Sequence, residues 1–289
     1  MTDLALEPAS RGAPQTSSRG AISIRNVVKT YGSGASQVTA VDDCSFEVAA
    51  GEICMVVGPS GCGKTSLLNA IAGFHDITSG EILIDGETIC GPDRPMAAPG
   101  PDRVVVFQNG ALFPWKTNLE NVAFGPTMQG TMTEAAAKAR ARSLLAEVGL
   151  DDVAERFPGE ISSGMRRRVE IARAVINEPR VLLLDEPYRA LDALTKQVMH
   201  EALLELYYRN KVTIFFITHD LEEAVFLGHK LVISTARPCR PKTIIEVDIP
   251  HPRDRSVITS PRFRELMEAA HEAVRQEAVA AFQAGDKEG

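Results

Sequence analysis

Two features are scarce in this chain: cysteines spaced to bind a metal, and long apolar runs. The 289 residues include five cysteines, with neither a Cys-x-x-Cys pair nor the spacing of a metal site. An odd number of cysteines, several in apolar and strand-like surroundings, indicates the buried, reduced thiols of a cytosolic protein. No segment approaches the roughly 18 apolar residues that a membrane-spanning helix needs. We therefore expect no membrane span.

The N-terminus also lacks the apolar core of a signal peptide. Residues 1–20 are rich in Ser, Pro, Gly and Ala, which is typical of a flexible polar tail. We therefore expect a cytosolic protein, which could still dock onto a membrane protein. The formal net charge of −7 argues against broad attraction to nucleic acid, although a local basic patch could exist. No nucleic-acid partner is expected.

Short β-branched runs alternate with helix-like segments along the chain. Residues 181–185 and 212–218 are continuously apolar, as in parallel strands covered on both faces. Helix-like segments follow several of the runs, so the pattern predicts a doubly wound α/β sheet. The other strand candidates are 53–57, 81–85, 103–108 and 230–234.

The segment between 103–108 and 181–185 is expected to be a mostly helical insertion. Its residues 133–150 are rich in good helix formers, with Thr133 as a candidate cap and Gly149 near the end. Beyond residue 240, a strand-like run precedes an amphipathic helix over 261–282. That helix could pack on the core or form a regulatory appendage.

Residues 58–65 read GPSGCGKT and lie between a strand candidate and a helix-like segment, which is the setting of a P-loop. Its glycines let backbone amides wrap phosphates, Lys64 brings a positive charge to the β- and γ-phosphates, and Thr65 can bind Mg²⁺. A glycine-rich turn that binds nothing is the weaker alternative. The pattern by itself predicts binding of a nucleoside triphosphate, and it predicts nothing more specific. The residues that we assign to this phosphate cradle are Gly58, Pro59, Ser60, Gly61, Cys62, Gly63, Lys64, Thr65 and Ser66.

The apolar run 181–185 ends on Asp185, and Glu186 follows it. The carboxyl end of a buried strand is where α/β sheets bind ligands, so Asp185 is placed to hold Mg²⁺ directly or through water. Glu186 could orient or deprotonate a water for attack on the γ-phosphate. Acidic residues at a strand end can also merely begin a turn, an alternative that the P-loop weakens.

With these two motifs, residues 20–240 resemble the ATP-binding subunits of ABC transporters. Tyr31 stands where that family has an aromatic residue that stacks on adenine, and Gln108 stands where a glutamine links Mg²⁺ and water to the transmembrane partner. Residues 161–165, ISSGM, occupy the place of the family signature, and residues 190–195 resemble its D-loop. The resemblance implies catalytic roles for Gln108, Glu186 and His219, Mg²⁺ contacts for Thr65, Gln108 and Asp185, and further ATP contacts for Tyr31, Ser162, Ser163, Gly164, Met165 and Asp192.

The resemblance also implies the architecture of a P-loop NTPase of RecA-like type. Its mostly parallel sheet would carry an N-terminal antiparallel β subdomain and an inserted α-helical subdomain over about 110–178. We accordingly divide the chain into the tail 1–20, an ATPase domain 21–240 and a C-terminal strand-and-helix extension 241–289.

The partners implied by the family are a second ATPase subunit bound head to tail, two integral-membrane permease subunits and a solute-binding protein. The protein would then sit peripherally on the cytoplasmic side of the inner membrane. Residues 99–108, 112–125 and 221–240 resemble the importer subgroup that serves nitrate, sulfonate, taurine and bicarbonate. A coupling helix of the permease would dock after Gln108, with Leu112, Phe113 and Trp115 as apolar anchors, unless these form an internal packing cluster.

Two residues depart from the family pattern. The signature usually reads Leu-Ser-Gly-Gly, and Ser163 replaces its first glycine. A negative φ at Ser163 would make the cost steric only, whereas a positive φ would add strain on the order of 1 kcal/mol. Arg189 follows the acidic strand end where the family often has glycine, and it could reach across a dimer or be solvated. We expect a working ATPase that Ser163 could slow.

Two other functions stay open as alternatives. A weakly hydrolysing regulatory or partner subunit of a heteromeric ABC complex would explain Ser163. A soluble ABC-type ATPase in nucleic-acid or ribosome work would usually carry two cassettes or a long coiled coil, and this chain has neither.

The arginines after the signature first suggest a basic patch. Val169, Ala172 and Ile176 continue an apolar helical stripe that begins at Met165, so the segment is expected to be an amphipathic helix. Glu170 lies four residues after Arg166 and three before Arg173, and pairing on the exposed face would account for part of the charge.

Overall fold

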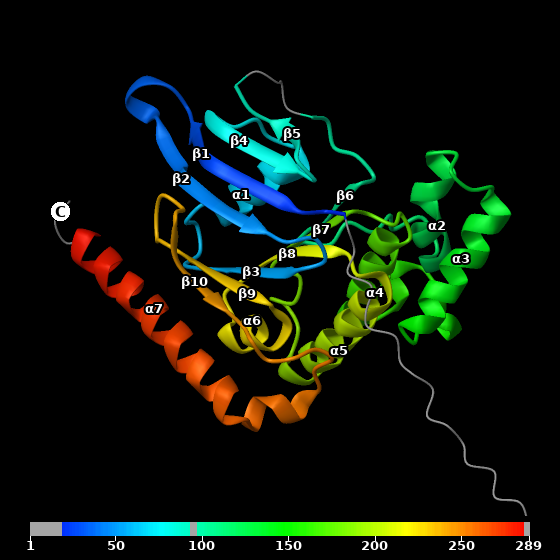
Figure 1. Cartoon of the computed structure of the whole chain (residues 1–289). Helices are drawn as coiled ribbons and strands as arrows, with labels where there is room; N and C mark the ends of the chain where they lie inside the picture. Colours follow the sequence, from blue (N-terminus) through cyan, green and yellow to red (C-terminus); the bar gives the residue numbers. More distant parts are fainter. Residues whose placement is uncertain (1–18, 93–96, 286–289) are drawn as a thin grey trace, which may run out of the picture.

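The computed structural model describes residues 19–92 and 97–285, so most of the predicted tail lies outside the described residues. A six-stranded sheet with the order β10-β9-β3-β8-β7-β6 forms the centre of the molecule (Figure 1). Neighbouring strands run parallel except for the pair β9 and β10. The strands are β3 (Ile53–Val57), β6 (Arg103–Val106), β7 (Val181–Asp185), β8 (Thr213–Thr218), β9 (Lys230–Ser234) and β10 (Pro241–Glu246).

Both faces of this sheet are buried. In β7, Val181 and Leu183 belong to one hydrophobic cluster, while Leu182 and Leu184 belong to the other. Side chains alternate along a strand, so a strand that is covered on both faces reads as one continuous apolar run. This confirms the prediction for 181–185. The candidate 103–108 was too long, because β6 ends at Val106.

An antiparallel sheet and one helix, α1 (Lys64–Ala72), cover one face. The sheet has the order β2-β1-β4-β5 and consists of β1 (Ile22–Tyr31), β2 (Val38–Val48), β4 (Ser79–Ile84) and β5 (Glu87–Cys90). Only β4 was a strand candidate from its own residues. Asn26 and Asp43 have positive φ values of 46° and 44° at register shifts in β1 and β2, and these shifts interrupt the alternation on which strand prediction rests.

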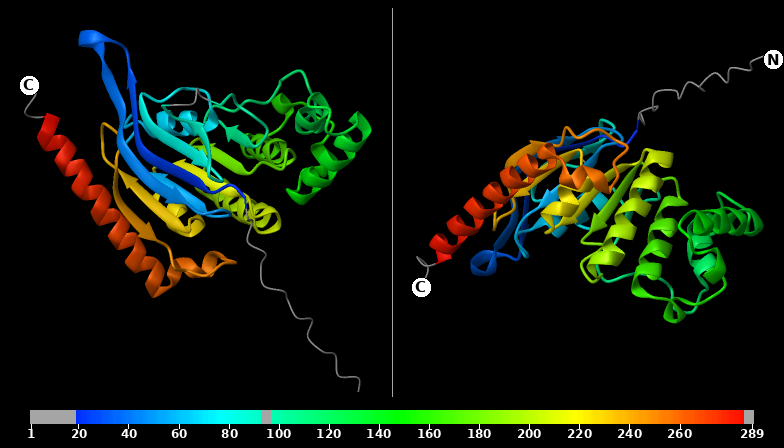
Figure 2. Two further views of the ribbon diagram at one scale, coloured as in Figure 1. Left: turned by 45° about the horizontal axis from the view of Figure 1, so that its top comes forward. Right: turned by 90° about the horizontal axis from the view of Figure 1, so that it is seen from below.

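Helices cover the other face, with α2 and α3 projecting at the end opposite α7 (Figure 2). The Thr133 hydroxyl accepts a hydrogen bond from the Ala136 N–H at 3.3 Å, which confirms the predicted cap of α3. No described helix has both the length and the apolar character to span a bilayer. These helices are α2 (Asn118–Met128), α3 (Glu134–Glu147), α4 (Ser163–Val175), α5 (Ala193–Asn210), α6 (Leu221–Leu227) and α7 (Pro261–Gly285).

The C-terminal helix α7 packs on the core along β9, β10 and α6 (Figure 1). Phe263, Leu266 and Ala270 are buried in the same hydrophobic cluster as the central sheet. The segment that leads into α7 is anchored by Arg253, which is 6% exposed. Its guanidinium donates to the carbonyl oxygens of Val225, Phe226, Gly228, Val247 and Ile249.

Replacing this anchor is expected to destabilise the protein. Arg253→Met would leave five buried carbonyl oxygens without their donor, and the free energy of unfolding should fall by about 3 kcal/mol or more. Urea unfolding measures this directly. Arg255→Met, which removes a solvent-accessible pair with Glu222, should cost under about 1 kcal/mol. Equal losses in the two variants would contradict the anchoring role.

Candidate nucleotide-binding site

The predicted P-loop joins β3 to α1 at the carboxyl edge of the central sheet. In the parallel register, Val57 at the end of β3 pairs with Thr218 of β8 and Ile233 of β9. Asp185 at the end of β7 pairs with Ile217 of β8. The residues that follow these strands therefore emerge side by side, although they are far apart in the sequence.

The loop coils closely around the Lys64 ammonium. Lys64 Nζ donates to the carbonyl oxygens of Gly58 at 2.7 Å and Pro59 at 2.8 Å, and the residue is only 4% exposed. Gly63 has a φ of +120°, and a Cβ there would lie 2.0 Å from the carbonyl oxygen of Ala40. The backbone path that holds Lys64 thus requires glycine at position 63.

The two acidic residues predicted for this edge lie beside the P-loop. Thr65 Oγ1 donates to the Asp185 carboxylate, with distances of 3.3 and 3.1 Å to its two oxygens. Burial raises the pKa of Asp185, while the hydrogen bond from Thr65 opposes that shift. Glu186 is also buried. Its Oε2 lies 3.1 Å from Arg189 Nη1 and 3.6 Å from His219 Nδ1.

Glu186 is held in an unusual backbone conformation. Its φ is +42°, and its N–H donates to the Ile217 carbonyl oxygen at 3.0 Å. Non-glycine residues rarely adopt positive φ, and such strained positions concentrate at functional sites.

A cavity of about 280 Å³ opens over the P-loop. Three of its lining residues were not among the predicted site residues: Ala40, Arg189 and Arg237. Arg237 follows β9, and its place just beyond a strand candidate on the same edge of the sheet was the signal that could have found it. The predicted residues that line the cavity are Tyr31, Ser60, Gly61, Cys62, Gly63, Lys64, Thr65, Ser66, Gln108 and Glu186.

Cys62 has a distinct environment among the five cysteines, all of which are free and buried as predicted. Its sulfur lies 3.4 Å from Ser234 Oγ and 3.5 Å from Lys64 Nζ. The neighbouring Cys239 thiol, and to a smaller extent Ser234 and Lys64, lower the pKa of Cys62 despite burial. By contrast, burial raises the pKa of Cys44 to about 12.

The signature-like residues form a separate cluster at the start of α4. Ser162 caps the helix, with its hydroxyl accepting from the Met165 N–H at 3.2 Å. Ser163 is the first helical residue and is exposed, and its φ is not positive. Ser163 therefore adds no backbone strain, and any cost of its side chain is steric only.

Asp192 plays the same capping role for α5, because its carboxylate accepts from the Thr195 N–H at 2.9 Å and from the Thr195 hydroxyl at 2.6 Å. The two helix starts meet at Gly164, where a Cβ would lie 2.6 Å from Thr195 Cγ2. Neither cluster lines the cavity over the P-loop.

Comparison with known proteins identifies the family. The family model described as "ABC transporter" matches residues 41–189.

The chain belongs to the ABC transporter family.

Curated relatives support this membership over most of the chain. The bicarbonate transport ATP-binding protein CmpD of Synechocystis sp. is 42% identical over 248 residues, which cover 85% of this chain and 86% of that protein. The taurine import ATP-binding protein TauB of Roseobacter denitrificans is 47% identical over 203 residues, covering 70% of this chain and 73% of that protein.

A solved ABC cassette confirms the predicted fold class. The dimeric post-hydrolysis structure of MJ0796 bound to ADP and Pi matches with a TM-score of 0.67 and 28% identity. The match covers 79% of this chain and 100% of that chain. The protein is thus an ATP-binding subunit of ABC type with a P-loop NTPase fold, and ATP hydrolysis is the activity of such cassettes.

In this ABC ATPase, two of the charged residues that follow the signature form a buried ion pair. Glu170 pairs with Arg167 at 2.6 Å, and both side chains are only 10% exposed. Arg166 instead donates to the carbonyl oxygens of Pro158 and Ile161. The predicted Arg166–Glu170 pairing on the exposed face is therefore wrong.

These charges are buried because the loop that contains Gln108 lies against α4. Arg167 donates to the carbonyl oxygens of Phe107 at 2.7 Å and Gln108 at 2.8 Å. Three residues further along the loop, the Ala111 N–H donates to Glu170 Oε1. These bonds fasten α4 to the backbone of the Gln108 loop.

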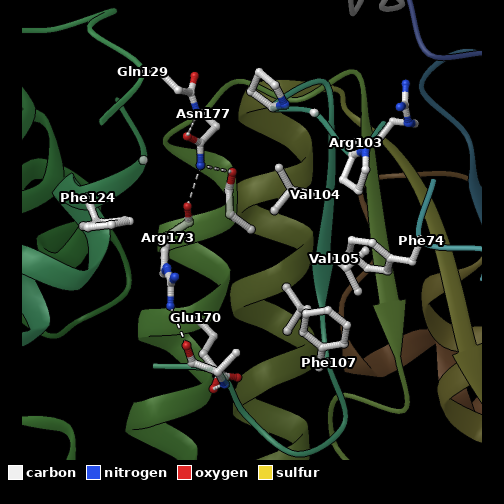
Figure 3. A pocket seen from close by; sticks show the side chains of 17 residues that line it. Phe74, Arg103, Val104, Val105, Phe107, Phe124, Gln129, Glu170, Arg173 and Asn177 are labelled. Carbon is white, nitrogen blue, oxygen red and sulfur yellow. Dashed lines mark hydrogen bonds between the residues drawn. The ribbon is translucent and has the colours of Figure 1, made fainter. Parts of the chain in front are cut away.

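A second cavity, of about 420 Å³, lies between β6 and α4 (Figure 3). Phe74, Phe107 and Phe124 line it, and Glu170 and Arg173 lie along one wall. Arg173 donates to the Ala111 carbonyl oxygen at 2.6 Å.

The three apolar anchors predicted in the segment after Gln108 divide between the two alternatives. Leu112 packs against the core, whereas Trp115 is 71% exposed. The Phe113 ring lies between the two, because it contacts the exposed Trp115 ring and the Phe124 ring that lines the cavity.

Gly164 is the signature glycine that packing requires. Gly164→Ala would press its new methyl group against Thr195 Cγ2, and we expect a loss of about 1–3 kcal/mol in unfolding free energy. The Thr195 rotamer is held by Asp192, so it cannot easily yield. Thermal or urea unfolding of Gly164→Ala with Thr195→Ser tests the cause, because serine keeps the hydroxyl and removes the methyl. If the double variant stays as unstable as Gly164→Ala, the close contact is not the reason.

Proposed function

We propose that this protein is the ATPase subunit of an importer and that it works in a head-to-tail dimer with a second ATPase subunit. One observation carries the proposal. The P-loop, Asp185, Glu186 and His219 gather at one edge of the sheet, whereas Ser162 and its neighbours form a separate cluster that does not line the P-loop cavity. A single chain thus presents two incomplete halves, which a second copy or a related subunit would complete.

The donor set beside the P-loop fits Mg²⁺. Mg²⁺ prefers oxygen ligands and usually binds through few protein groups together with substrate phosphates. The Thr65 hydroxyl and the Asp185 carboxylate are already in contact, and Gln108 lines the same cavity. When bound, the ion would neutralise charge on the β- and γ-phosphates.

Glu186 is the residue proposed to act on the attacking water. Its carboxylate lies at the cavity, where it would orient the water and accept its proton. His219 lies within reach of the same carboxylate oxygen and would help to hold it in place. Lys64 would bind the β- and γ-phosphates.

The remaining predicted contacts divide between the two subunits of the dimer. Tyr31 is 38% exposed at the cavity, and its ring would stack on adenine. The signature-like residues and the D-loop would reach the nucleotide bound by the partner. The residues proposed for this second role are Ser162, Ser163, Gly164, Met165 and Asp192.

The transported solute is proposed to be a small anion or organic molecule. The support is the likeness to a bicarbonate and a taurine transport protein, together with phrases of the sequence typical of that importer subgroup. Two membrane permease subunits and a solute-binding protein would complete the machine, with this chain on the cytoplasmic face of the inner membrane. ATP turnover of the reconstituted complex, with its binding protein loaded with taurine, bicarbonate or nitrate, would identify the solute.

The permease is proposed to dock a coupling helix at the cavity between β6 and α4 (Figure 3). Three phenylalanines would receive its apolar side chains, while Glu170 and Arg173 would offer polar contacts. Trp115 extends this surface toward solvent. Because Arg167 and Glu170 also hold the Gln108 loop, a helix bound here would touch the segment that reaches the nucleotide.

Catalysis is tested by ATP turnover of the assembled complex. Glu186→Gln should lower kcat by about 10²- to 10⁴-fold, the range for loss of a positioned general base. Ser163→Gly should stay within a few-fold of the native protein, since Ser163 adds no backbone strain. If the native complex is as inactive as Glu186→Gln while Ser163→Gly hydrolyses ATP, the regulatory-subunit alternative replaces this proposal.

Docking is tested by co-purification with the permease subunits. Trp115→Ala should reduce recovery of the complex several-fold without changing the melting temperature, because the side chain is 71% exposed and contributes little to the core. Phe157→Ala, an exposed aromatic outside this cavity, is the matched control. Equal recovery for both variants would argue against the proposed surface.

A further inference from the structure

The turn between β9 and β10 reaches the cavity over the P-loop through Arg237. It is closed by the Thr235 N–H, which donates to the Arg240 carbonyl oxygen at 2.9 Å, and by the Arg240 N–H, which donates to the Thr235 hydroxyl at 3.0 Å. β9 lies beside β3 in parallel, so the turn emerges next to the P-loop.

Contacts fix this turn against the P-loop. The Cys239 N–H donates to the Ala40 carbonyl oxygen at 2.8 Å. A Cβ at Gly63 would meet the Cβ of Cys239 at 3.0 Å, so the Cys239 side chain packs against the P-loop. At the end of β9, Ser234 Oγ lies 3.4 Å from Cys62 Sγ.

Arg237 lies in this turn and lines the cavity together with Lys64 and Tyr31. It is exposed, and no carboxylate among the described residues forms an ion pair with it. Arg240, three residues further on, is by contrast paired with Asp42. An unpaired guanidinium beside a P-loop matches the charge and geometry of a phosphate.

The position of the turn depends on the C-terminal helix. Glu277 of α7 is only 8% exposed, and its Oε1 accepts from the Ala236 N–H at 2.7 Å. Its Oε2 pairs with Lys242 Nζ at 3.0 Å. A buried carboxylate is costly unless it is bonded, so Lys242 helps to fix the Glu277 carboxylate. The bond from the Ala236 N–H then holds the residue immediately before Arg237 in place.

We propose that Arg237 is a phosphate-binding residue of the nucleotide site and that Glu277 is its positioning residue. The ligand class is the polyphosphate chain of a nucleoside triphosphate or diphosphate. The C-terminal helix is thereby part of the nucleotide site, and anything that displaces α7 weakens nucleotide binding.

Isothermal titration of the full chain with ATP and with ADP, in the presence of Mg²⁺, tests Arg237. Arg237→Gln should bind both nucleotides about tenfold more weakly, the loss typical of one charge-assisted hydrogen bond. Arg237→Lys should recover part of that loss, and the difference from the native protein should shrink at high salt. Arg240→Gln removes a cation from the same turn but outside the cavity, and it should bind like the native protein. Native affinity in Arg237→Gln would overturn the proposal.

A double-mutant cycle tests Glu277. Glu277→Ala should weaken ATP binding several-fold, and the combination with Arg237→Gln should bind no worse than Arg237→Gln alone. Glu272→Ala, an exposed position on the same helix, is the control and should leave binding unchanged. Additive losses would show that Glu277 does not act through Arg237.

The variant Glu277→Gln covers the case in which Glu277→Ala does not fold. It keeps the acceptor for the Ala236 N–H, and binding close to native is expected. A loss as large as that of Arg237→Gln would overturn the positioning role of this hydrogen bond.

Discussion

Parallel pairing of β3 with β8 and β9, and of β7 with β8, is the constraint on which the nucleotide site depends. Parallel strands end at the same edge, so the segments that follow them are brought together whatever their distance in the sequence. Four segments meet in this way: the P-loop, the acidic pair, the segment with His219 and the turn with Arg237. The neighbouring strand also holds Glu186 in its positive-φ conformation, because the Glu186 N–H donates to the carbonyl oxygen of Ile217 in β8.

The charged side of α4 links this edge to the helical part of the molecule. Arg167 and Glu170 hold the loop that contains Gln108, and the helix that carries them starts at the signature-like Ser162. Breaking a buried ion pair by removing one partner is costly, so the loop and the helix are expected to move as one body. Within the basic run that first suggested a nucleic-acid patch, Arg167 thus connects α4 to the Gln108 loop.

Motifs that lie within one short segment could be predicted from the sequence, and contacts between segments could not. The P-loop, the apolar strands of the central sheet and the cap at Thr133 each depend on neighbouring residues only. The Arg167–Glu170 pair was missed because Arg166 has the equally favourable spacing of four residues, and only the packed Gln108 loop decides between them. β1 and β2 were missed because their register shifts at Asn26 and Asp43 disturb the alternation. Arg237 carries no motif, and its place just beyond a strand candidate becomes informative once β9 is seen to lie beside β3.

The difference between features of one segment and contacts between segments also bears on Ser163, which replaces a signature glycine. The family pattern places two small residues in succession, and the pattern alone does not say which one the fold needs. At the first turn of α4 the backbone of position 163 is helical and its side chain is exposed in the single chain, so the fold of the subunit accommodates a side chain there. At position 164 the start of α5 comes within contact distance, and Thr195 leaves no room for a side chain. Within the subunit, the packing of two helix starts therefore constrains Gly164, and Ser163 lies outside that contact.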